Sequence, residues 1–391
     1  MTASTRTEVV IVGGGPAGLM LSHLLHLVGI GSVVIDNRTV AEISTTHRAG
    51  ILERDSVRLL SDSGASSRVL TDGVEHEGIS LRFSGVNHRL DFQELVGASC
   101  WLYPQTEVFV DLYQTRIDDG GDVRYGVSDT EVFDVDDRSR IRYRIDGVSH
   151  EISADVVVGA DGSRGICRAL VDPRNQYFRE YPFAWFGVLV EAPPSHPELI
   201  YARSDAGFAL LSQRSNTVQR MYFQCDRNED VAEWSDDRIW AEFHQRLAGT
   251  DGFELAEGPV IEKSVLPFRS FVQSPMHQDN LILIGDAAHT VPPTGAKGLN
   301  LALADARLAA EVIERALRKS DDSALGEYTD RALRRVWRAQ QFSYWMTTML
   351  HRAGDATEFD DLRQLGELRS LVSSHAGSAY FAEGYTGWPQ P

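Results

Sequence analysis

Residues 8–36 constrain the fold of this chain more than any other segment. An apolar strand leads into a glycine-rich turn, an apolar helix and a second apolar strand. Strands that are continuously apolar are typical of a buried parallel sheet, so the segment predicts a βαβ unit. The turn has the spacing G-x-G-x-x-G, at Gly13, Gly15 and Gly18, and Asp36 closes the second strand.

This combination is the fingerprint of a dinucleotide site. The glycines make a tight turn that admits a pyrophosphate, and an acid about twenty residues further on binds the ribose hydroxyls of an adenosine. The alternative is a purely structural turn between strand and helix. The fingerprint does not distinguish a nicotinamide from a flavin coenzyme.

Two later segments place further acid–glycine pairs at the ends of apolar strands. "ADVVVGADGSRG" contains Asp161-Gly162, and "NLILIGDAAH" contains Gly285-Asp286. Either pair alone is more often a simple turn. After the second pair, prolines and glycines at 292–298 precede a long helix. Small residues and the free N–H groups at the start of a helix predict a binding site for a flat, electron-rich ligand.

Charge and cysteine content limit the partners. The formal net charge of −18 over 391 residues argues against nucleic acid and against anionic membrane surfaces. An anionic substrate would therefore need a local cation. The N-terminus has no apolar signal core, and the cysteines are far apart without metal-ligand spacing. We therefore expect no metal site and a reducing cytoplasm, with three cysteines at Cys100, Cys167 and Cys225.

In this order and spacing, the three strand-end motifs resemble those of the class A flavoprotein aromatic hydroxylases. "ELIYARSDAGFALLSQRS", "PPTGAKGLNLA", "FSYWMTTMLHR" and "AEGYTG" are similar to the 4-hydroxybenzoate 3-monooxygenase family, and the resemblance runs from residue 8 to about 388. It implies FAD as cofactor, NADH or NADPH and O2 as co-substrates, and hydroxylation of 4-hydroxybenzoate to 3,4-dihydroxybenzoate through a flavin hydroperoxide. The alternatives are another hydroxy- or aminobenzoate substrate, or a non-catalytic FAD-binding sensor.

The expected fold is α/β. A Rossmann-like, glutathione-reductase-like FAD domain occupies residues 1–180, with 73–99 contributing to the substrate side. A β-rich substrate domain at 181–270 is inserted before the chain returns to the FAD domain at 271–320. Residues 321–391 are expected to be a helical region that forms a homodimer interface, although its Trp337 and Trp345 could equally close the core. Helices are also expected at 48–64, 105–118 and 230–248, a hairpin at 76–92, and mostly helix from 300 to about 373.

The resemblance also implies a way to remove the substrate's phenolic proton. Tyr201 and Tyr385 match a hydrogen-bonded relay, and His76 matches its outlet to solvent. A phenolate is a better nucleophile than a phenol, and a tyrosine pair can take up the proton without placing a carboxylate beside an anionic ring. The backbone carbonyl of Pro293 matches one that touches the reacting edge. Taken alone, each tyrosine or histidine could simply be a packing residue.

Three residues match the family's carboxylate-binding set: Ser212, Arg214 and Tyr222. Side chains repeat every two residues along a strand, so Ser212 and Arg214 should point the same way. A hydroxyl and a guanidinium together suit a carboxylate, and the guanidinium supplies the missing local cation. Without the resemblance, Arg214 would be taken for a solvated strand arginine.

The remaining matches concern the two coenzymes. Besides the fingerprint residues, the family's FAD contacts fall on Arg48, Gln105, Asp161, Arg220, Asp286, Gly298, Leu299 and Asn300. Arg164 and Arg269 are candidates for the nicotinamide coenzyme's pyrophosphate. Arg38 is retained beside Asp36, but Glu42 and Thr46 stand where an aromatic residue and an arginine are expected for NADPH. Glu42 would repel a 2′-phosphate, so we expect NADH to be accepted.

Overall fold

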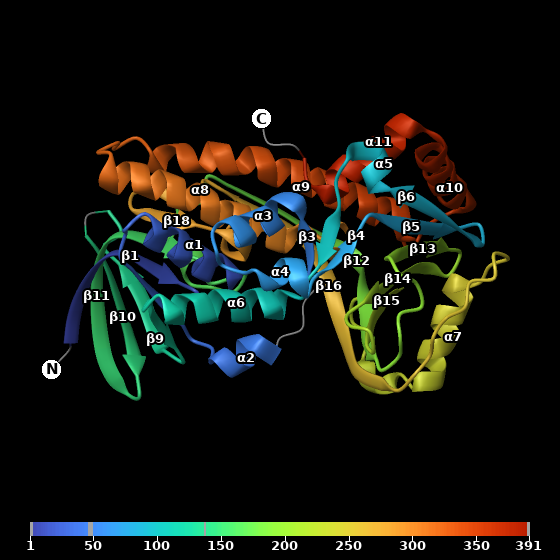
Figure 1. Cartoon of the computed structure of the whole chain (residues 1–391), viewed down its shortest axis with the longest axis horizontal. Coiled ribbons are helices and arrows are strands. Elements are labelled where there is room, and N and C mark those ends of the chain that lie inside the picture. Colours follow the sequence, from blue (N-terminus) through green and yellow to red (C-terminus); the bar gives the residue numbers. More distant parts are fainter. Residues whose placement is uncertain (1–2, 46–49, 137, 389–391) are drawn as a thin grey trace.

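The computed structural model describes residues 3–45, 50–136 and 138–388. Two large sheets lie side by side along the long axis of the molecule (Figure 1). Helices α8 and α9 run above the first sheet in this view, and α6 runs below it. The second sheet lies between α7 on one side and α10 and α11 on the other.

The first sheet has the order β17-β18-β11-β1-β2-β8, and β10 and β9 extend it from β11. The four central pairings are parallel, as the continuous apolar runs predicted. Strands and helices of this layer are β1 (Ala3–Val12), β2 (Ser32–Asp36), β8 (Asp122–Tyr125), β9 (Ser128–Phe133), β10 (Ser139–Ile145), β11 (Val148–Gly159), β17 (His277–Gln278), β18 (Leu281–Leu283), α1 (Pro16–Leu27), α2 (Val40–Thr45), α6 (Gln105–Asp118) and α8 (Gly298–Arg318).

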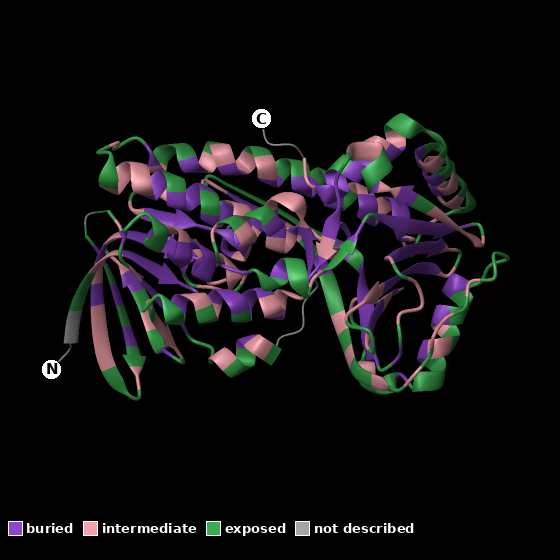
Figure 2. Cartoon of the chain, viewed as in Figure 1, coloured by how far each residue is buried: buried purple, intermediate pink, exposed green. Residues whose placement is uncertain are grey.

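Burial explains why this layer forms. The central strands are buried on both faces, whereas the outer helices alternate buried and exposed positions (Figure 2). Val9, Val10, Ile11 and Leu19 have no exposed surface and belong to one core. Strands covered on both faces need apolar residues at every position, which is the pattern the sequence carries.

The second sheet has the order β19-β16-β12-β15-β14-β13-β5-β6. The hairpin β5–β6 reaches it from early in the chain, because β5 pairs in parallel with β13. Its strands, with the helix that covers one face, are β5 (Gly78–Phe83), β6 (Val86–Asp91), β12 (Asn175–Val190), β13 (Ile200–Ser204), β14 (Gly207–Gln213), β15 (Gln219–Cys225), β16 (Val260–Ser274), β19 (His289–Thr290) and α7 (Asp236–Leu247).

A small sheet and the C-terminal helices complete the fold. The small sheet has the order β3-β7-β4 and lies where the two larger sheets meet. Helix α9 begins in the core of the first sheet and ends in the core shared by the second sheet and α10–α11. The remaining elements are β3 (Ile51–Glu53), β4 (Val74–His76), β7 (Cys100–Leu102), α3 (Arg54–Asp62), α4 (Arg68–Thr71), α5 (Phe92–Val96), α9 (Tyr328–Leu350), α10 (Glu358–Ser373) and α11 (His375–Thr386).

The predicted α/β class with a helical C-terminal region is confirmed, and so are the helix at 105–118 and the hairpin expected at 76–92, which the strands β5 and β6 form over 78–91. The helix expected from 48 begins only at Arg54, because Ile51–Glu53 pair with β7 as a strand. Helix α7 begins at Asp236 behind a Ser235 cap, and the helical C-terminal region continues to Thr386 rather than 373. The domain boundaries remain predictions.

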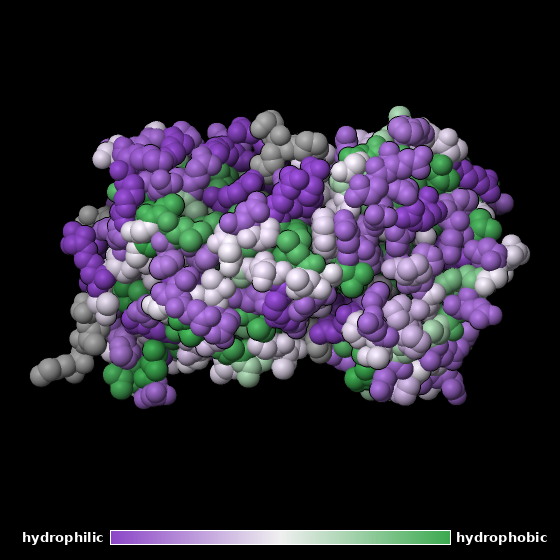
Figure 3. All heavy atoms as spheres, viewed as in Figure 1, coloured by the Kyte–Doolittle hydropathy of each residue, from purple (hydrophilic) through white to green (hydrophobic). Residues whose placement is uncertain are grey.

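The face shown in Figure 3 is mostly hydrophilic, with apolar residues in scattered patches. Within the described ranges, no helix is long and apolar enough to cross a membrane.

Candidate active site

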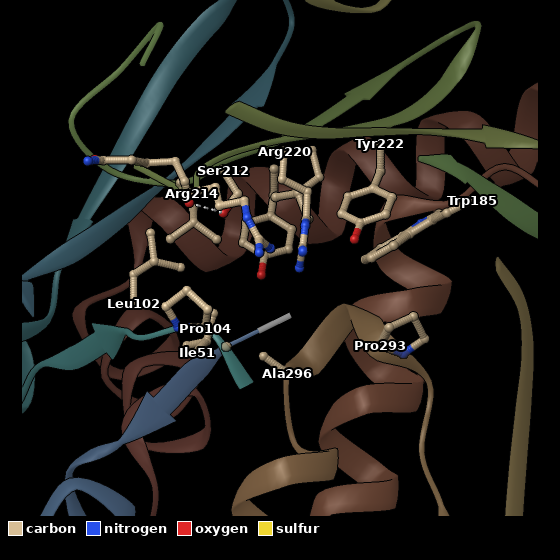
Figure 4. Close-up of a pocket in the computed structure, with 15 residues that line it drawn as sticks. Ile51, Leu102, Pro104, Trp185, Ser212, Arg214, Arg220, Tyr222, Pro293 and Ala296 are labelled. Atoms are coloured by element: carbon tan, nitrogen blue, oxygen red, sulfur yellow. Dashed lines mark hydrogen bonds between the residues drawn. The ribbon is translucent and has the colours of Figure 1, made fainter. Parts of the chain in front are cut away.

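A pocket opens where the second sheet meets the small sheet and the turn before α8. Strands β13, β14 and β15 form one wall, and β3, β7 and the 3-10 turn η4 (Pro293–Gly295) form the other. Figure 4 shows the side chains of Arg214, Arg220 and Tyr222 extending from the second sheet toward Pro293 and Ala296. Segments that are far apart in the sequence therefore share one pocket.

The predicted carboxylate-binding residues Ser212, Arg214 and Tyr222 all line this pocket. Strand β14 ends at Gln213, so Arg214 lies one residue beyond the strand on which the sequence placed it. Its backbone N–H still donates to the carbonyl of Val218, at 2.9 Å. The strand ladder thus continues into the turn, and Arg214 reaches the pocket from there.

Arg220 adds a second guanidinium to the pocket. Burial lowers the pKa of Arg214, and the positive charge of Arg220 lowers it further. Nη2 of Arg220 is buried and has no hydrogen-bond partner among the described residues. Two close cations, one of them incompletely satisfied, make this end of the pocket suited to an anion.

The two tyrosines of the predicted relay lie together. The hydroxyl oxygens of Tyr201 on β13 and Tyr385 on α11 are 2.8 Å apart, and both side chains are buried. Tyr201 also lines the pocket. Burial raises the pKa of both phenols, so both are neutral at physiological pH and each can donate and accept a proton.

His76 lies at the end of β4, opposite Cys100 on β7. It is buried, and neither ring nitrogen has a hydrogen-bond partner within the part of the chain described. Burial lowers its pKa. No hydrogen bond between described residues joins His76 to the tyrosine pair, so its predicted role as an outlet stays a prediction.

The turn before α8 has the open form that the sequence suggested. Pro293 and Ala296 line the pocket, and Ala296 adopts the left-handed conformation at φ 52°. A Cβ added to Gly298, the first residue of α8, would meet no atom within 4 Å. Leu299 follows it in the first turn, where backbone N–H groups lack partners within the helix.

The Asn300 side chain has a structural role. Its Nδ2 donates to the carbonyls of Ile51 and Ala296, and its Oδ1 accepts from the N–H of Glu53. It therefore ties β3 to the turn. A ligand contact from Asn300 would come through its backbone N–H.

Of the three fingerprint glycines in the turn after β1, only Gly15 has open space beside it. A Cβ added to Gly13 or Gly18 would collide with backbone atoms. A Cβ added to Gly15 would have Nη2 of Arg38 as its nearest neighbour, at 3.9 Å. Gly15 caps the N-terminus of α1. This spacing allows a phosphate to approach the helix N-terminus closely.

Comparisons with known proteins agree with this geometry. A sequence model of the family described as "FAD binding domain" matches residues 6–343. The p-hydroxybenzoate hydroxylase of Acinetobacter baylyi (strain ATCC 33305 / BD413 / ADP1) is 40% identical over 387 residues, covering 98% of this chain and 96% of that protein.

The chain belongs to the p-hydroxybenzoate hydroxylase family. It is an FAD-dependent aromatic hydroxylase that uses NAD(P)H as reductant. A 3-(3-hydroxy-phenyl)propionate/3-hydroxycinnamic acid hydroxylase of Mycolicibacterium gilvum is 28% identical, over 81% of this chain and 56% of that protein. The p-nitrophenol 4-monooxygenase PnpA of Pseudomonas putida shares the fold, with a TM-score of 0.83 at 18% identity over 100% of both chains.

The remaining FAD candidates lie at two strand ends and at one helix start. Asp161 follows β11; its Oδ2 accepts from the N–H of Cys167, while its buried Oδ1 has no partner in the described ranges. Burial raises its pKa. Asp286 lies in the turn after β18, and Gln105 is the first residue of α6, next to the pocket-lining Pro104. Arg48 lies outside the described residues.

Asp36 differs from the simple expectation of an open ribose site. Its carboxylate accepts from the N–H of Gly14 at 2.8 Å, and from Nε and Nη2 of Arg38 at 3.0 and 2.8 Å. A ribose contact at Asp36 would require Arg38 to move aside.

The side chain of Glu42 accepts from the N–H and hydroxyl of Thr39, at the start of α2. Thr46 is not among the described residues.

Arg164 and Arg269, the candidates for the coenzyme pyrophosphate, lie on one edge. Nη2 of Arg269 donates to the hydroxyl of Ser163, the residue before Arg164, at 2.6 Å. Both arginines are exposed.

No local pattern in the sequence signals a partly buried ion pair that lies beside the relay. Nζ of Lys297 donates to Glu53 Oε1 at 2.6 Å and to the carbonyl of Tyr385 at 3.0 Å. A second buried network lies under the turn at Asp286, where Asp305 pairs with His289 at 2.6 Å and accepts from the N–H of Gly285.

A buried histidine behind the pocket predicts how stability depends on pH. Burial lowers the pKa of His351 to about 3. An unfolded histidine binds a proton near pH 6.5, so between these values the unfolded state binds more protons and stability falls as pH falls. From pH 7 to pH 5 this residue should remove about 2 kcal/mol from the free energy of unfolding. Urea unfolding of the parent and His351→Gln at both pH values tests this, and an equal pH dependence in the two proteins would contradict it.

Proposed function

We propose that this enzyme hydroxylates 4-hydroxybenzoate at the ring position next to its hydroxyl group, giving 3,4-dihydroxybenzoate, with NAD(P)H and O2. The observation that carries the proposal is that Arg214 and Tyr201 line one pocket, with the Tyr201 hydroxyl 2.8 Å from that of Tyr385. A ligand with a carboxylate at one end and a phenol at the other matches these two groups.

Two sets of residues would act on the substrate, one at its carboxylate and one at its phenol. Arg214, with Ser212 and Tyr222, binds the carboxylate and so orients the ring. Tyr201 accepts the phenolic proton while passing its own to Tyr385, which in turn gives up its proton toward solvent, with His76 as the proposed outlet. Because burial raises the pKa of both tyrosines, neither holds a charge, and the relay conducts a proton without storing it.

FAD fits the glycine turn and the open start of α8. When bound and reduced by NAD(P)H, it supplies the activated oxygen that is transferred to the ring. The N–H groups of Gly298, Leu299 and Asn300 at the N-terminus of α8 would stabilise negative charge on its ring. The carbonyl of Pro293 would touch the reacting edge of the substrate.

A titration of the bound flavin's absorbance with 4-hydroxybenzoate, other hydroxybenzoates and aminobenzoates tests the substrate. We expect 4-hydroxybenzoate to perturb the flavin spectrum, to accelerate NAD(P)H oxidation and to give a catechol in proportion. Oxidation that produces only hydrogen peroxide would point to a different benzoate. A sensor without catalysis would show binding and no product.

Replacing Arg214 tests the anchor for the carboxylate. Arg214→Ala should weaken binding of 4-hydroxybenzoate by about 2–5 kcal/mol, because the ligand's carboxylate would be buried without its partner. Arg227→Ala is the control, since Arg227 pairs with Glu180 at the surface. Dissociation constants from the flavin titration decide the point, and unchanged affinity in Arg214→Ala would remove Arg214 from the site.

Replacing Tyr201 tests the relay. Tyr201→Phe should leave flavin reduction and ligand binding largely intact while slowing hydroxylation by about 10²-fold, the scale of one general acid–base group. Tyr328→Phe removes another buried hydroxyl, which donates to the carbonyl of Leu283 in the first core, and should not slow hydroxylation. If Tyr201→Phe hydroxylates at the parental rate, the relay is wrongly assigned.

We also propose that the enzyme accepts NADH readily and prefers it. Arg38 is neutralised by Asp36, and Glu42 adds negative charge at the same edge, so a 2′-phosphate finds little attraction there. Glu42→Gln can keep the hydrogen bond to Thr39 while removing the charge, and should raise kcat/KM for NADPH relative to NADH. A parental preference for NADPH of about a hundredfold, or about 2.7 kcal/mol, would refute the proposal.

The predicted homodimer is part of this proposal, as is a cytoplasmic location. A groove between the β12–β16 ribbon and α9 is lined by Tyr177, Phe178, Trp337 and Tyr344, each of which is 40–60% exposed. Such a patch suits a second copy of the chain. Trp345 instead packs in the second core and donates to Glu367.

Light scattering should give the mass of two chains for the parent and of one chain for Trp337→Glu, because the substitution places a charge in the apolar patch. A monomeric parent would exclude the dimer.

A further inference from the structure

The wall of the pocket contains a tryptophan whose indole N–H is bonded to a residue behind the pocket. Trp185 on β12 lines the pocket, across from Pro293 on the turn before α8 (Figure 4). Its indole Nε1 donates to Nε2 of His351, at 2.7 Å. Both residues are buried, and His351 lies directly after α9, so the wall is joined to the end of that helix.

The hydrogen bonds of His351 fix its tautomer. Nδ1 lies 2.9 Å from the carbonyl oxygen of Thr347, which can only accept, so Nδ1 carries the proton. Nε2 is then bare and accepts from the indole of Trp185. The imidazole also stacks on Phe183 and Phe208, with ring centroids 4.6 and 4.3 Å away. Burial lowers its pKa to about 3, so the ring is neutral at working pH.

The same helix end reaches the turn on which the flavin ring is expected to lie. The hydroxyl of Thr347 shares a hydrogen bond with the hydroxyl of Thr294, at 2.9 Å, and both residues are fully buried. Thr294 lies between Pro293 and Ala296, which line the pocket. Thr347 thus connects the two sides, because its carbonyl accepts from His351 and its hydroxyl bonds the turn before α8.

We propose that His351 is a positioning residue that fixes the plane of the Trp185 indole and thereby the width of the pocket between Trp185 and the Pro293–Ala296 turn. The inference deepens the proposed function, because it assumes that this pocket holds the aromatic acid. The rings that pack on the indole belong to Phe208, Tyr222 and Phe268; the two phenylalanines carry no acceptor, and no hydrogen bond between described residues joins the indole N–H to the Tyr222 hydroxyl. Without His351, the indole would gain hydrogen-bonding by turning toward the pocket or toward water.

Two substitutions separate positioning from bulk packing. His351→Leu removes the acceptor, whereas the amide of His351→Gln can accept from Trp185 and donate to Thr347. In the holoenzyme, we expect His351→Leu to raise the dissociation constant for 4-hydroxybenzoate at least tenfold, and His351→Gln to stay within threefold of the parent. In a Trp185→Phe background, which has no indole N–H, His351→Leu should change the dissociation constant less than twofold.

Trp234 offers a matched control on the other face of the same sheet. Its buried indole donates to Glu229 at 2.9 Å, in a core that does not touch the pocket. Glu229→Leu should lower the melting temperature without changing ligand affinity. His351 is only structural, and the inference fails, if His351→Leu lowers the melting temperature without changing ligand affinity, as Glu229→Leu should. The inference also fails if His351→Leu weakens ligand binding equally in the Trp185→Phe background.

A ligand-free measurement keeps this test separate from the substrate assignment. The fluorescence of Trp185 is the difference between the parent and Trp185→Phe spectra. His351→Leu should alter that difference spectrum, and His351→Gln should restore it. An unchanged spectrum would overturn the inference whatever the substrate is. Failure of every benzoate to bind the parent would overturn the proposed function and, with it, the role in setting the width of a benzoate pocket.

Discussion

The packing of helix α9 across two cores is the constraint on which the site depends. Tyr328, Ala332 and Val336 are buried with the parallel sheet, while Phe342 and Met346 are buried with the second sheet and α11. Close-packed interiors resist sliding, so the two sheets cannot shift without opening one of these cores. The pocket lies at this junction and takes its shape from it.

Polar groups at the junction are mostly paired with one another. Tyr201 bonds Tyr385, Lys297 bonds Glu53, and Trp185 bonds His351. Such pairs are stable inside a protein because each buried donor has an acceptor. Arg220 is different, since one of its buried nitrogens has no partner among the described residues. A buried cation in this state favours an anionic ligand, which is what a benzoate provides.

Elements and contacts could be predicted from the sequence only where neighbouring residues determine them. The hairpin at 78–91 and the helix at 105–118 follow from alternation and periodicity within a few residues. The strand at Ile51–Glu53 was read as helix, because only its pairing with Cys100–Leu102 makes it a strand. Arg214 was placed on a strand that ends one residue earlier, and the hydrogen bonds by which the Asn300 side chain holds β3 were not foreseen. Lys297, Asp305 and His351 carry no local signal, since their side-chain partners Glu53, His289 and Trp185 lie 16 or more positions away in the chain.

The βαβ unit, its glycine turn and the α/β class could be predicted from the sequence alone, because they depend on residue types at fixed short spacings, and the family followed from the resemblance of several longer segments. Only the tertiary structure decided that Tyr201 meets Tyr385 across 184 positions of chain, that Arg214 and Arg220 share one pocket, and that Asp36 is already paired with Arg38. The physical reason is that hydrogen bonds and charge pairs act over a few ångströms in space. Which side chains come that close is set by how the cores pack, and no short stretch of sequence contains that information.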